Sequence, residues 1–179
     1  ATFTVVLNTL PLGDVTIPIT SSDPTEGTVS AASLTFTTLN WNTAQTVTVT
    51  GVDDVIVDGN IAFNILTGDP TSIADANYDA LTAASVADVA VTNNDNDVAG
   101  AAVSALIGGP TTEGATTATF TVVLNTLPLG DVTIPITSSD PTEGTVSPAS
   151  LTFTILNWNT AQTVTVTGVD DVIVDGNIA

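Results

Sequence analysis

Apolar and polar residues alternate along most of this chain, which is the two-residue period of a β-strand with one buried face. Val, Ile, Leu and Phe recur at every second position, Thr fills many of the positions between them, and Gly, Pro, Asp and Asn interrupt the pattern at intervals. No segment has the sustained 3.6-residue period of an amphipathic helix. The pattern therefore predicts an all-β protein.

The strand pattern is itself repeated. Residues 1–62 align with residues 118–179 at an offset of 117 without a gap, and the two copies differ only where Ala31 becomes Pro148 and Thr38 becomes Ile155. A repeat of this length can enclose its own hydrophobic core. We therefore expect tandem immunoglobulin-like Greek-key β-sandwiches with about seven strands per repeat.

We expect two domains: a repeat lacking its first strand at residues 1–98, and a repeat lacking its last two strands at residues 99–179. Because the chain begins inside a strand pattern and ends just after a turn, we expect a window from a longer tandem array. The alternative is a protomer that polymerises by sharing strands, which would duplicate half a repeat at each joint. The strands of one repeat are expected at 102–107, 116–124 (repeated at 1–7), 15–20, 33–37, 46–52, 61–66 and 86–92.

The charge of the chain is entirely negative. It carries 19 Asp and Glu residues and no Lys, Arg or His, giving a net charge of −19, while 43% of its residues are hydrophobic. The hydrophobic content argues against a disordered acidic tail. Nucleic-acid binding is excluded because no side chain can neutralise a phosphate. No apolar run approaches the about 20 residues of a membrane span, so we expect no membrane insertion. An acidic halophile surface is an alternative, although such chains usually carry acid more densely.

The chain has no covalent means of stiffening that the sequence reveals. Without Cys it can form neither a disulfide nor a thiolate metal site, and without Lys it cannot form a Lys–Asn isopeptide cross-link. Zn²⁺ and Cu²⁺ usually require His or Cys. Ca²⁺ instead accepts about 6–8 oxygen ligands, whereas Mg²⁺ demands a tighter octahedral site. Ca²⁺ is therefore the cofactor that we expect.

The expected strand order collects acidic loops at one end of each sandwich: those after the first, third and fifth strands, and the exit from the seventh. Two carboxylates about 4 Å apart repel by roughly 4 kcal/mol at an effective dielectric constant near 20, a cost that a divalent cation would convert into binding. For any single acid the alternative is a solvated turn residue. Glu26 and Glu143 are expected at this end but are not in the ligand set. The candidate metal ligands are Asp23, Asp53, Asp54, Asp58, Asp95, Asp97, Glu113, Asp140, Asp170, Asp171 and Asp175.

Three segments resemble the Calx-beta-type repeat of large bacterial surface proteins and of sodium–calcium exchanger regulatory domains: AVSALIGGPTTEGATTATFTVVL, SPASLTFTILNWNTAQTVTVTGVDD and VADVAVTNNDND. The resemblance implies a β-sandwich that binds Ca²⁺ at the acidic end. The exchanger domains are more densely acidic, so fewer or weaker ions are implied here, and regulation of a transporter is not implied. The ligand roles that it implies are those of Glu113, Asp53, Asp54, Asp170, Asp171, Asp95 and Asp97.

The function that we expect is structural: a repeat of a long extracellular stalk or filament at the cell surface, stiffened by Ca²⁺ at the junctions between repeats. Its partners would be neighbouring repeats and, in a filament, other copies. The alternative is an adhesin or carbohydrate-binding repeat, with Trp41 or the loop of Tyr78 as the contact, and ice binding by the Thr-rich strands is a minor variant. We expect no enzyme, because only a two-carboxylate glycosidase mechanism is available and the sequence suggests no cleft.

Overall fold

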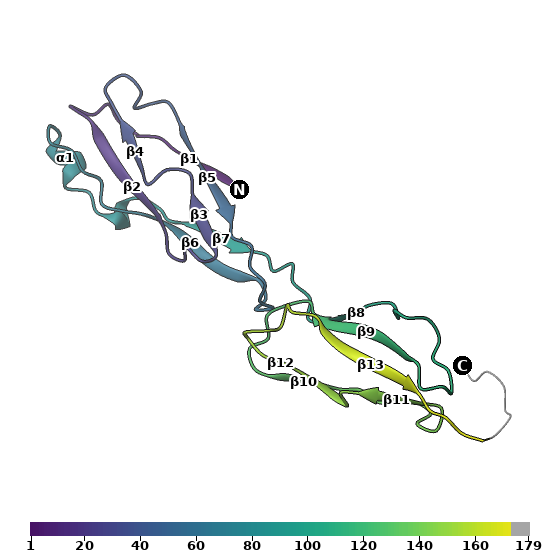
Figure 1. Cartoon of the computed structure of the whole chain (residues 1–179). Coiled ribbons are helices and arrows are strands. Elements are labelled where there is room, and N and C mark those ends of the chain that lie inside the picture. The colour runs from purple at the N-terminus through teal and green to yellow at the C-terminus, as the bar shows by residue number, and fades with distance from the viewer. Residues whose placement is uncertain (173–179) are drawn as a thin grey trace. The chain divides into compact units, whose positions relative to one another are not determined.

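The structure is a computed structural model, and it describes residues 1–172. Antiparallel β-sheets make up its regular structure, together with two short helical turns (Figure 1). The prediction of an all-β protein is confirmed. The chain divides into two compact units. Unit 1 comprises Ala1–Asp54 and Asp58–Asp95, and unit 2 comprises Val55–Val57 and Asn96–Ala179.

Unit 1 contains seven strands and both helical turns. The turns, α1 (Ala76–Asp79) and the 3-10 turn η1 (Ala83–Ser85), lie in the long connection between the last two strands. This connection therefore has local structure of its own. The strands are β1 (Thr2–Val5), β2 (Val15–Ser21), β3 (Gly27–Val29), β4 (Ser33–Phe36), β5 (Gln45–Gly51), β6 (Ile61–Thr67) and β7 (Val89–Asn93).

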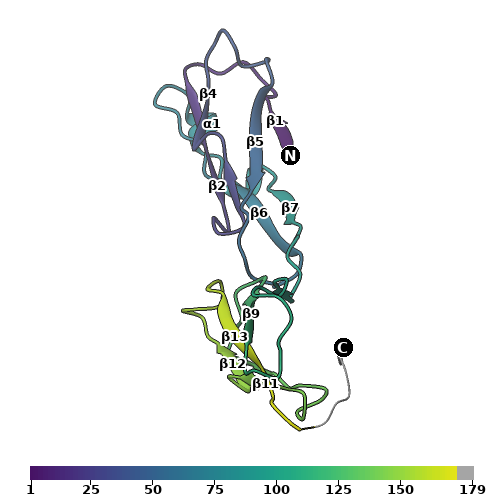
Figure 2. The same cartoon turned by 45° about the vertical axis from the view of Figure 1, so that its right-hand side comes forward.

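Two sheets enclose the core of unit 1. One has the strand order β1-β5-β3 and the other the order β4-β2-β6-β7; Figure 1 labels all of these strands, and Figure 2 shows most of them from a second side. Alternate residues of β2, β4, β5 and β6 are buried, which is how the two-residue period of the sequence becomes a core face. The buried core residues are Leu7, Val15, Ile17, Ile19, Leu34, Phe36, Val47, Val49, Phe63 and Ile65.

Pro18 lacks an amide hydrogen, and proline within a sheet is usually confined to an edge strand or a bulge. The strand that contains it, β2, is not an edge strand, because β4 and β6 flank it. Beyond the Ile19–Thr67 pair, the register moves by one residue before the isolated bridge between Thr16 and Thr71. Pro18 therefore lies in a bulged stretch of a central strand, where its missing amide breaks no regular pairing.

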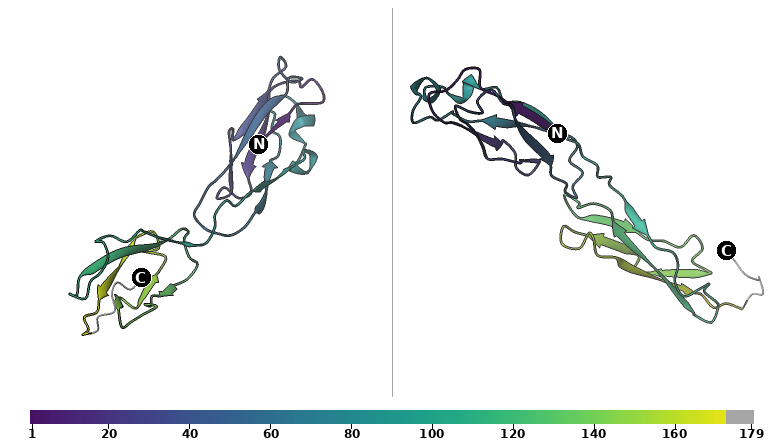
Figure 3. Two further views of the ribbon diagram at one scale, coloured as in Figure 1. Left: turned by 90° about the vertical axis from the view of Figure 1, so that its right-hand side faces the viewer. Right: turned by 90° about the horizontal axis from the view of Figure 1, so that it is seen from above.

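Unit 2, drawn in green to yellow in the two further views of Figure 3, repeats part of this arrangement. One sheet has the order β11-β13-β9-β8 and the other pairs β10 with β12. Val122, Leu151, Phe153 and Val164 form its buried core. The strands are β8 (Ala101–Val103), β9 (Thr117–Leu124), β10 (Val132–Pro135), β11 (Gly144–Ser147), β12 (Ser150–Phe153) and β13 (Gln162–Gly168).

Several strand bounds differ from those predicted, for physical reasons. The predicted strand at 102–107 ends at Val103, and Ile107 keeps only an isolated bridge to Thr119. The predicted strand at 86–92 begins at Val89, because η1 ends only at Ser85 and Thr67 then bonds to the Val86 carbonyl oxygen and the Asp88 carboxylate in place of a strand ladder. The short strands β3 and β11 were not predicted. No helix among the described residues is long and apolar enough to cross a membrane.

Candidate metal centre

One end of unit 1 gathers three segments that are far apart in the sequence: the turn before β3, the segment after β5 and the exit from β7. The pairing of β3 with β5 brings the first two together, because Gly27 lies opposite Gly51. Just beyond that pair, the Val52 amide donates a hydrogen bond of 2.9 Å to the Glu26 carbonyl oxygen. Glu26 is thereby held beside the segment that carries Asp54.

Asn93, the last residue of β7, joins these segments through its side chain. Its Nδ2 donates to the Glu26 carboxylate oxygen Oε2 at 3.2 Å and to the Val52 carbonyl oxygen at 2.7 Å. A Cβ atom added at Gly51 would lie 2.5 Å from the Asn93 Oδ1 atom, so glycine leaves the room that this amide needs. Asn93 therefore orients the Glu26 carboxylate.

The Asp58-Gly59 turn, which leads into β6, is fixed from the exit of β7. Gly59 has φ of 80°, a conformation that residues with a Cβ atom rarely adopt. Its amide donates to Asp95 Oδ2 at 2.8 Å, while the Asp95 amide donates to Asn60 Oδ1 at 3.0 Å. These two bonds hold the turn, and with it Asp58, against the residues that follow β7.

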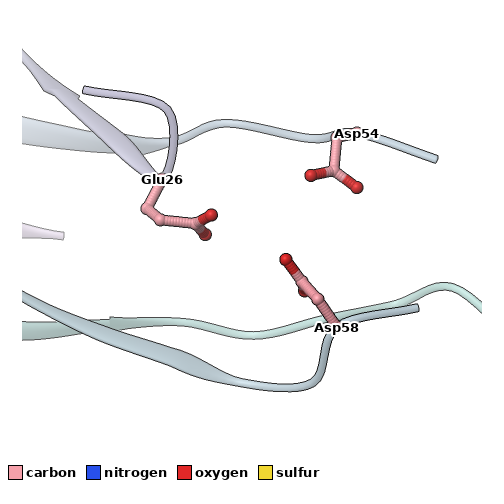
Figure 4. A group of neighbouring side chains, drawn as sticks. All are labelled: Glu26, Asp54 and Asp58. Carbon is pink, nitrogen blue, oxygen red and sulfur yellow. The ribbon is translucent and has the colours of Figure 1, made fainter. Parts of the chain in front are cut away.

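The result is a group of three carboxylates, those of Glu26, Asp54 and Asp58. One oxygen atom from each lies within 4.8 Å of the other two, and Glu26 is half-buried while the other two side chains are exposed. Figure 4 shows the three carboxylates projecting from separate segments toward one common space. The chain has no Lys, Arg or His side chain to neutralise them. The group could hold a metal ion.

The donor set determines which metal ions would fit. Carboxylate oxygens are hard ligands suited to Ca²⁺, Mg²⁺ or Mn²⁺, and the site offers neither the imidazole nor the thiolate that Zn²⁺ and Cu²⁺ favour. Three carboxylates can supply three to about six oxygens, depending on how many bind in a bidentate manner. Two of the three side chains are exposed, so water can complete the coordination shell.

The group overlaps only in part with the predicted ligand set of this unit. Asp54 and Asp58 belong to it, whereas their predicted partners Asp53 and Asp95 do not. Asp95 instead accepts the hydrogen bond that fixes the return turn. Glu26 was placed at this end by the sequence but not assigned as a ligand. The available signal was its position in the same acidic turn as Asp23.

Asp23 and its repeat counterpart Asp140 bind their own turns. The Asp23 carboxylate accepts hydrogen bonds from the Thr25 hydroxyl at 2.5 Å and the Thr25 amide at 3.1 Å, and Asp140 binds Thr142 in the same way. The threonine hydroxyl, followed by the amide, lowers the pKa of each carboxyl below its usual value of 3.8. This is the turn-forming role that the sequence left open for each acid.

The corresponding loops also meet in unit 2. The Gly168 amide donates to the Thr116 carbonyl oxygen at 3.1 Å, and the Val169 amide donates to the Glu143 carbonyl oxygen at 2.9 Å. Glu113, in the loop before β9, and both Asp170 and Asp171 are exposed there, and Asp97 is half-buried in the segment before β8. Asp175, the counterpart of Asp58, lies outside the described residues.

The acids at the other end of unit 1 support its loops. Asp75 is 4% exposed and accepts hydrogen bonds from the amides of Leu12 and Asn77, at 2.9 and 3.0 Å. The Leu12 bond is the main cause of the lowered pKa of Asp75. Both aromatic side chains considered for sugar contact, Trp41 and Tyr78, pack partly buried against the core.

Comparison with known proteins adds no further constraint: no family model, curated protein or solved structure matches the chain.

Proposed function

We propose that this chain is a structural segment of a long extracellular stalk or filament at the cell surface, stiffened by Ca²⁺ and without catalytic activity. The observation that carries this proposal is the group formed by Glu26, Asp54 and Asp58, whose oxygens lie within 4.8 Å of one another in a chain without a cationic side chain. Such a group repels itself until a cation binds, so the protein would be rigid only in a medium that supplies the ion. Millimolar extracellular Ca²⁺ is such a medium.

The position of the ligands along the chain supports a stiffening role. Asp54 is the last residue of unit 1 before the chain leaves it, and Asp58 is the first after the chain returns. The three residues between them, Val55–Val57, belong to unit 2. A cation held by both aspartates and Glu26 would fix the points of departure and return, and so restrain the path of the chain from one repeat to the next.

The proposal includes the finer fold that the sequence predicts, immunoglobulin-like Greek-key sandwiches of the Calx-beta type. Its support in unit 1 is the presence of seven strands in two sheets. In addition, β2 pairs with β6 rather than with a strand adjacent in sequence, so the chain crosses between the sheets. The near-identity of residues 1–62 and 118–179 supports a tandem array.

Calorimetric titration of the chain with CaCl₂ tests the proposal. We expect saturable binding that is lost in the Asp54→Asn and Asp58→Asn variants and kept in Asp53→Asn, a matched control that removes the same charge beside the group but not from it. Binding that is absent from the unaltered chain, or equally weakened in all three variants, would refute this site.

A further inference from the structure

A pocket opens on the outer face of unit 1, between strands β2 and β6 and the segment that follows η1. Its volume is about 520 Å³, within the range of about 300–1,000 Å³ that is usual for small-molecule sites. Pro18, Thr20 and Leu66 line it from the sheet, and Val86 and Asp88 line it from the opposite side. It shares no residue with the group formed by the three carboxylates. The pocket is therefore a separate feature of the unit.

The bulge at Pro18 shapes the side of the pocket formed by the sheet. Regular pairing of β2 with β6 ends at Ile19 and Thr67, and beyond it the Gly68 amide donates to the Pro18 carbonyl oxygen at 2.9 Å. A Cβ atom added at Gly68 would lie 3.1 Å from the Pro18 side chain, so a larger residue would crowd this surface. Bulges are over-represented beside functional sites because they redirect side chains at the surface of a sheet.

Three hydrogen bonds fix the opposite side of the pocket to the sheet. The Thr67 hydroxyl donates to the Val86 carbonyl oxygen at 2.9 Å, and the Thr67 amide donates to Asp88 Oδ1 at 2.9 Å. At the beginning of η1, the Ala83 amide donates to Asp69 Oδ1 at 2.6 Å. The pocket is therefore formed before a ligand arrives, and binding does not have to order its walls.

The polar groups of the pocket determine the charge of its ligand. Thr67 is 2% exposed and its hydroxyl already binds Val86, so the floor offers mainly apolar surface. Asp88 is exposed at the rim, and its Oδ2 atom accepts no hydrogen bond from any described residue. The chain has no Lys, Arg or His, so neither it nor a second copy has a cationic side chain to pair with this carboxylate. A complementary ligand must bring the positive charge itself.

We propose that this pocket binds a small primary alkylammonium ion, whose aliphatic chain packs on Pro18, Leu66 and Val86 and whose ammonium group donates to Asp88 Oδ2. The half-buried Pro18 and Val86 lie deeper than the exposed Asp88, so the chain of the ligand enters first and its charge stays at the rim. A lysine side chain of a partner protein would enter with its ammonium first and place the charge against apolar surface. The site is independent of calcium and of the proposed function.

The test is a titration of n-butylammonium chloride into the ¹⁵N-labelled full chain, in EDTA and with NaCl adjusted to keep the ionic strength constant. We expect a saturable shift of the Thr67 and Asp88 amide resonances. n-Butanol has the same chain without the charge and should bind about fivefold more weakly, the loss expected for one ion pair in water. Nα-acetyl-lysine amide, which carries a peptide at the far end of the chain, should also bind more weakly than n-butylammonium.

Asp88→Asn keeps an acceptor for Thr67 and should weaken n-butylammonium binding about fivefold. Asp14→Asn is the matched control: it removes the same charge at an exposed residue outside the pocket and should leave binding unchanged. Ala84→Leu, which fills the pocket, should abolish the shift, whereas Ala44→Leu, at an exposed residue outside it, should not.

The proposal is overturned if n-butylammonium produces no saturable shift, if n-butanol or the lysine derivative binds as tightly, or if Asp88→Asn and Asp14→Asn bind n-butylammonium equally well. Because EDTA is present throughout, these results concern the pocket alone. The calcium titration with the Asp58→Asn variant tests the proposed function separately.

Discussion

Asp58→Asn should stabilise unit 1 in the absence of Ca²⁺ and destabilise it, relative to the unaltered chain, when Ca²⁺ is bound. The substitution nearly preserves the volume of the side chain and removes one of the three grouped carboxylates. In the absence of metal it relieves repulsion, and in its presence it deletes a ligand. A residue that merely supports the turn would show no such change of sign.

The magnitude without metal follows from the geometry. Oxygens of Glu26, Asp54 and Asp58 lie within 4.8 Å of one another. At that distance, two unit charges repel by about 0.9 kcal/mol at the dielectric constant of water and by about 3.5 kcal/mol at an effective constant of 20. Two of the side chains are exposed, so the lower figure applies. Since Asp58 takes part in two pairs, its neutralisation in EDTA should stabilise unit 1 by about 1–2 kcal/mol.

The magnitude with metal follows from linkage. At a calcium concentration 100 times the Kd, binding adds about 2.7 kcal/mol to the free energy of unfolding, or roughly 10–20 °C in Tm for a unit of about 90 residues. A carboxylate oxygen about 2.4 Å from a divalent ion attracts it by about 3.5 kcal/mol even in water, so its loss should raise the Kd by at least about a hundredfold. The same calcium concentration would then contribute at most about 0.4 kcal/mol.

The assay is thermal unfolding followed by Trp41 fluorescence in a Trp158→Phe background, so that unit 1 alone is observed. Unaltered unit 1 should gain about 10–20 °C in Tm between EDTA and saturating Ca²⁺, and Asp58→Asn only a few degrees. Asp53→Asn, the matched charge control, should keep the full gain. A Tm independent of Ca²⁺, or equal losses of this gain in the two variants, would refute the reasoning.

Three further outcomes are expected. Asn93→Ala should destabilise unit 1 by about 1–3 kcal/mol in urea unfolding, because the Glu26 carboxylate and the Val52 carbonyl both lose a hydrogen-bond donor. It should also weaken Ca²⁺ binding, and an unchanged Kd for Ca²⁺ would contradict the role of Asn93 in orienting the Glu26 carboxylate. The pKa of Asp75 is lowered in the fold, so the contribution of this carboxylate to stability is fully present above pH 3.8 and is lost as the pH falls through the lowered pKa. Asp75→Asn should therefore make stability less dependent on pH in an acid unfolding curve over that range. A curve identical to that of the unaltered chain would contradict this role of Asp75. Phe36→Ala, at a fully buried position, should cost about 3–5 kcal/mol by urea unfolding, and a loss below about 1 kcal/mol would contradict the assigned core.

The longer strands could be predicted from the sequence because their apolar residues alternate with polar ones, as expected for a strand with one buried face. β2, β5 and β6 each have seven residues, enough for the alternation to be visible. β3 has only the three residues Gly27–Val29, and it exists because β5 lies beside it. A pairing made across the fold leaves no periodic trace in so short a segment, so β3 could not be predicted.

The candidate site shows the same limit. Asp54 and Asp58 were assigned as ligands because the expected strand order put their loop at the acidic end. Glu26 was not assigned, because its carboxylate reaches the others only through the β3–β5 pairing and the Asn93 side chain. Asp23 could have been separated from the ligands by sequence, since an Asp two residues before a Thr in a Pro-containing turn commonly binds that turn. The burial of Asp75 depends on the distant Leu12 amide and leaves no local signal.

A high-resolution crystal structure of the chain grown in millimolar CaCl₂ tests the central claim most directly. The account predicts an ion bound by Glu26, Asp54 and Asp58, with about 6–8 oxygens at about 2.3–2.6 Å from it. Three carboxylates that point away from one another in saturating calcium, each contacted only by water, would contradict it.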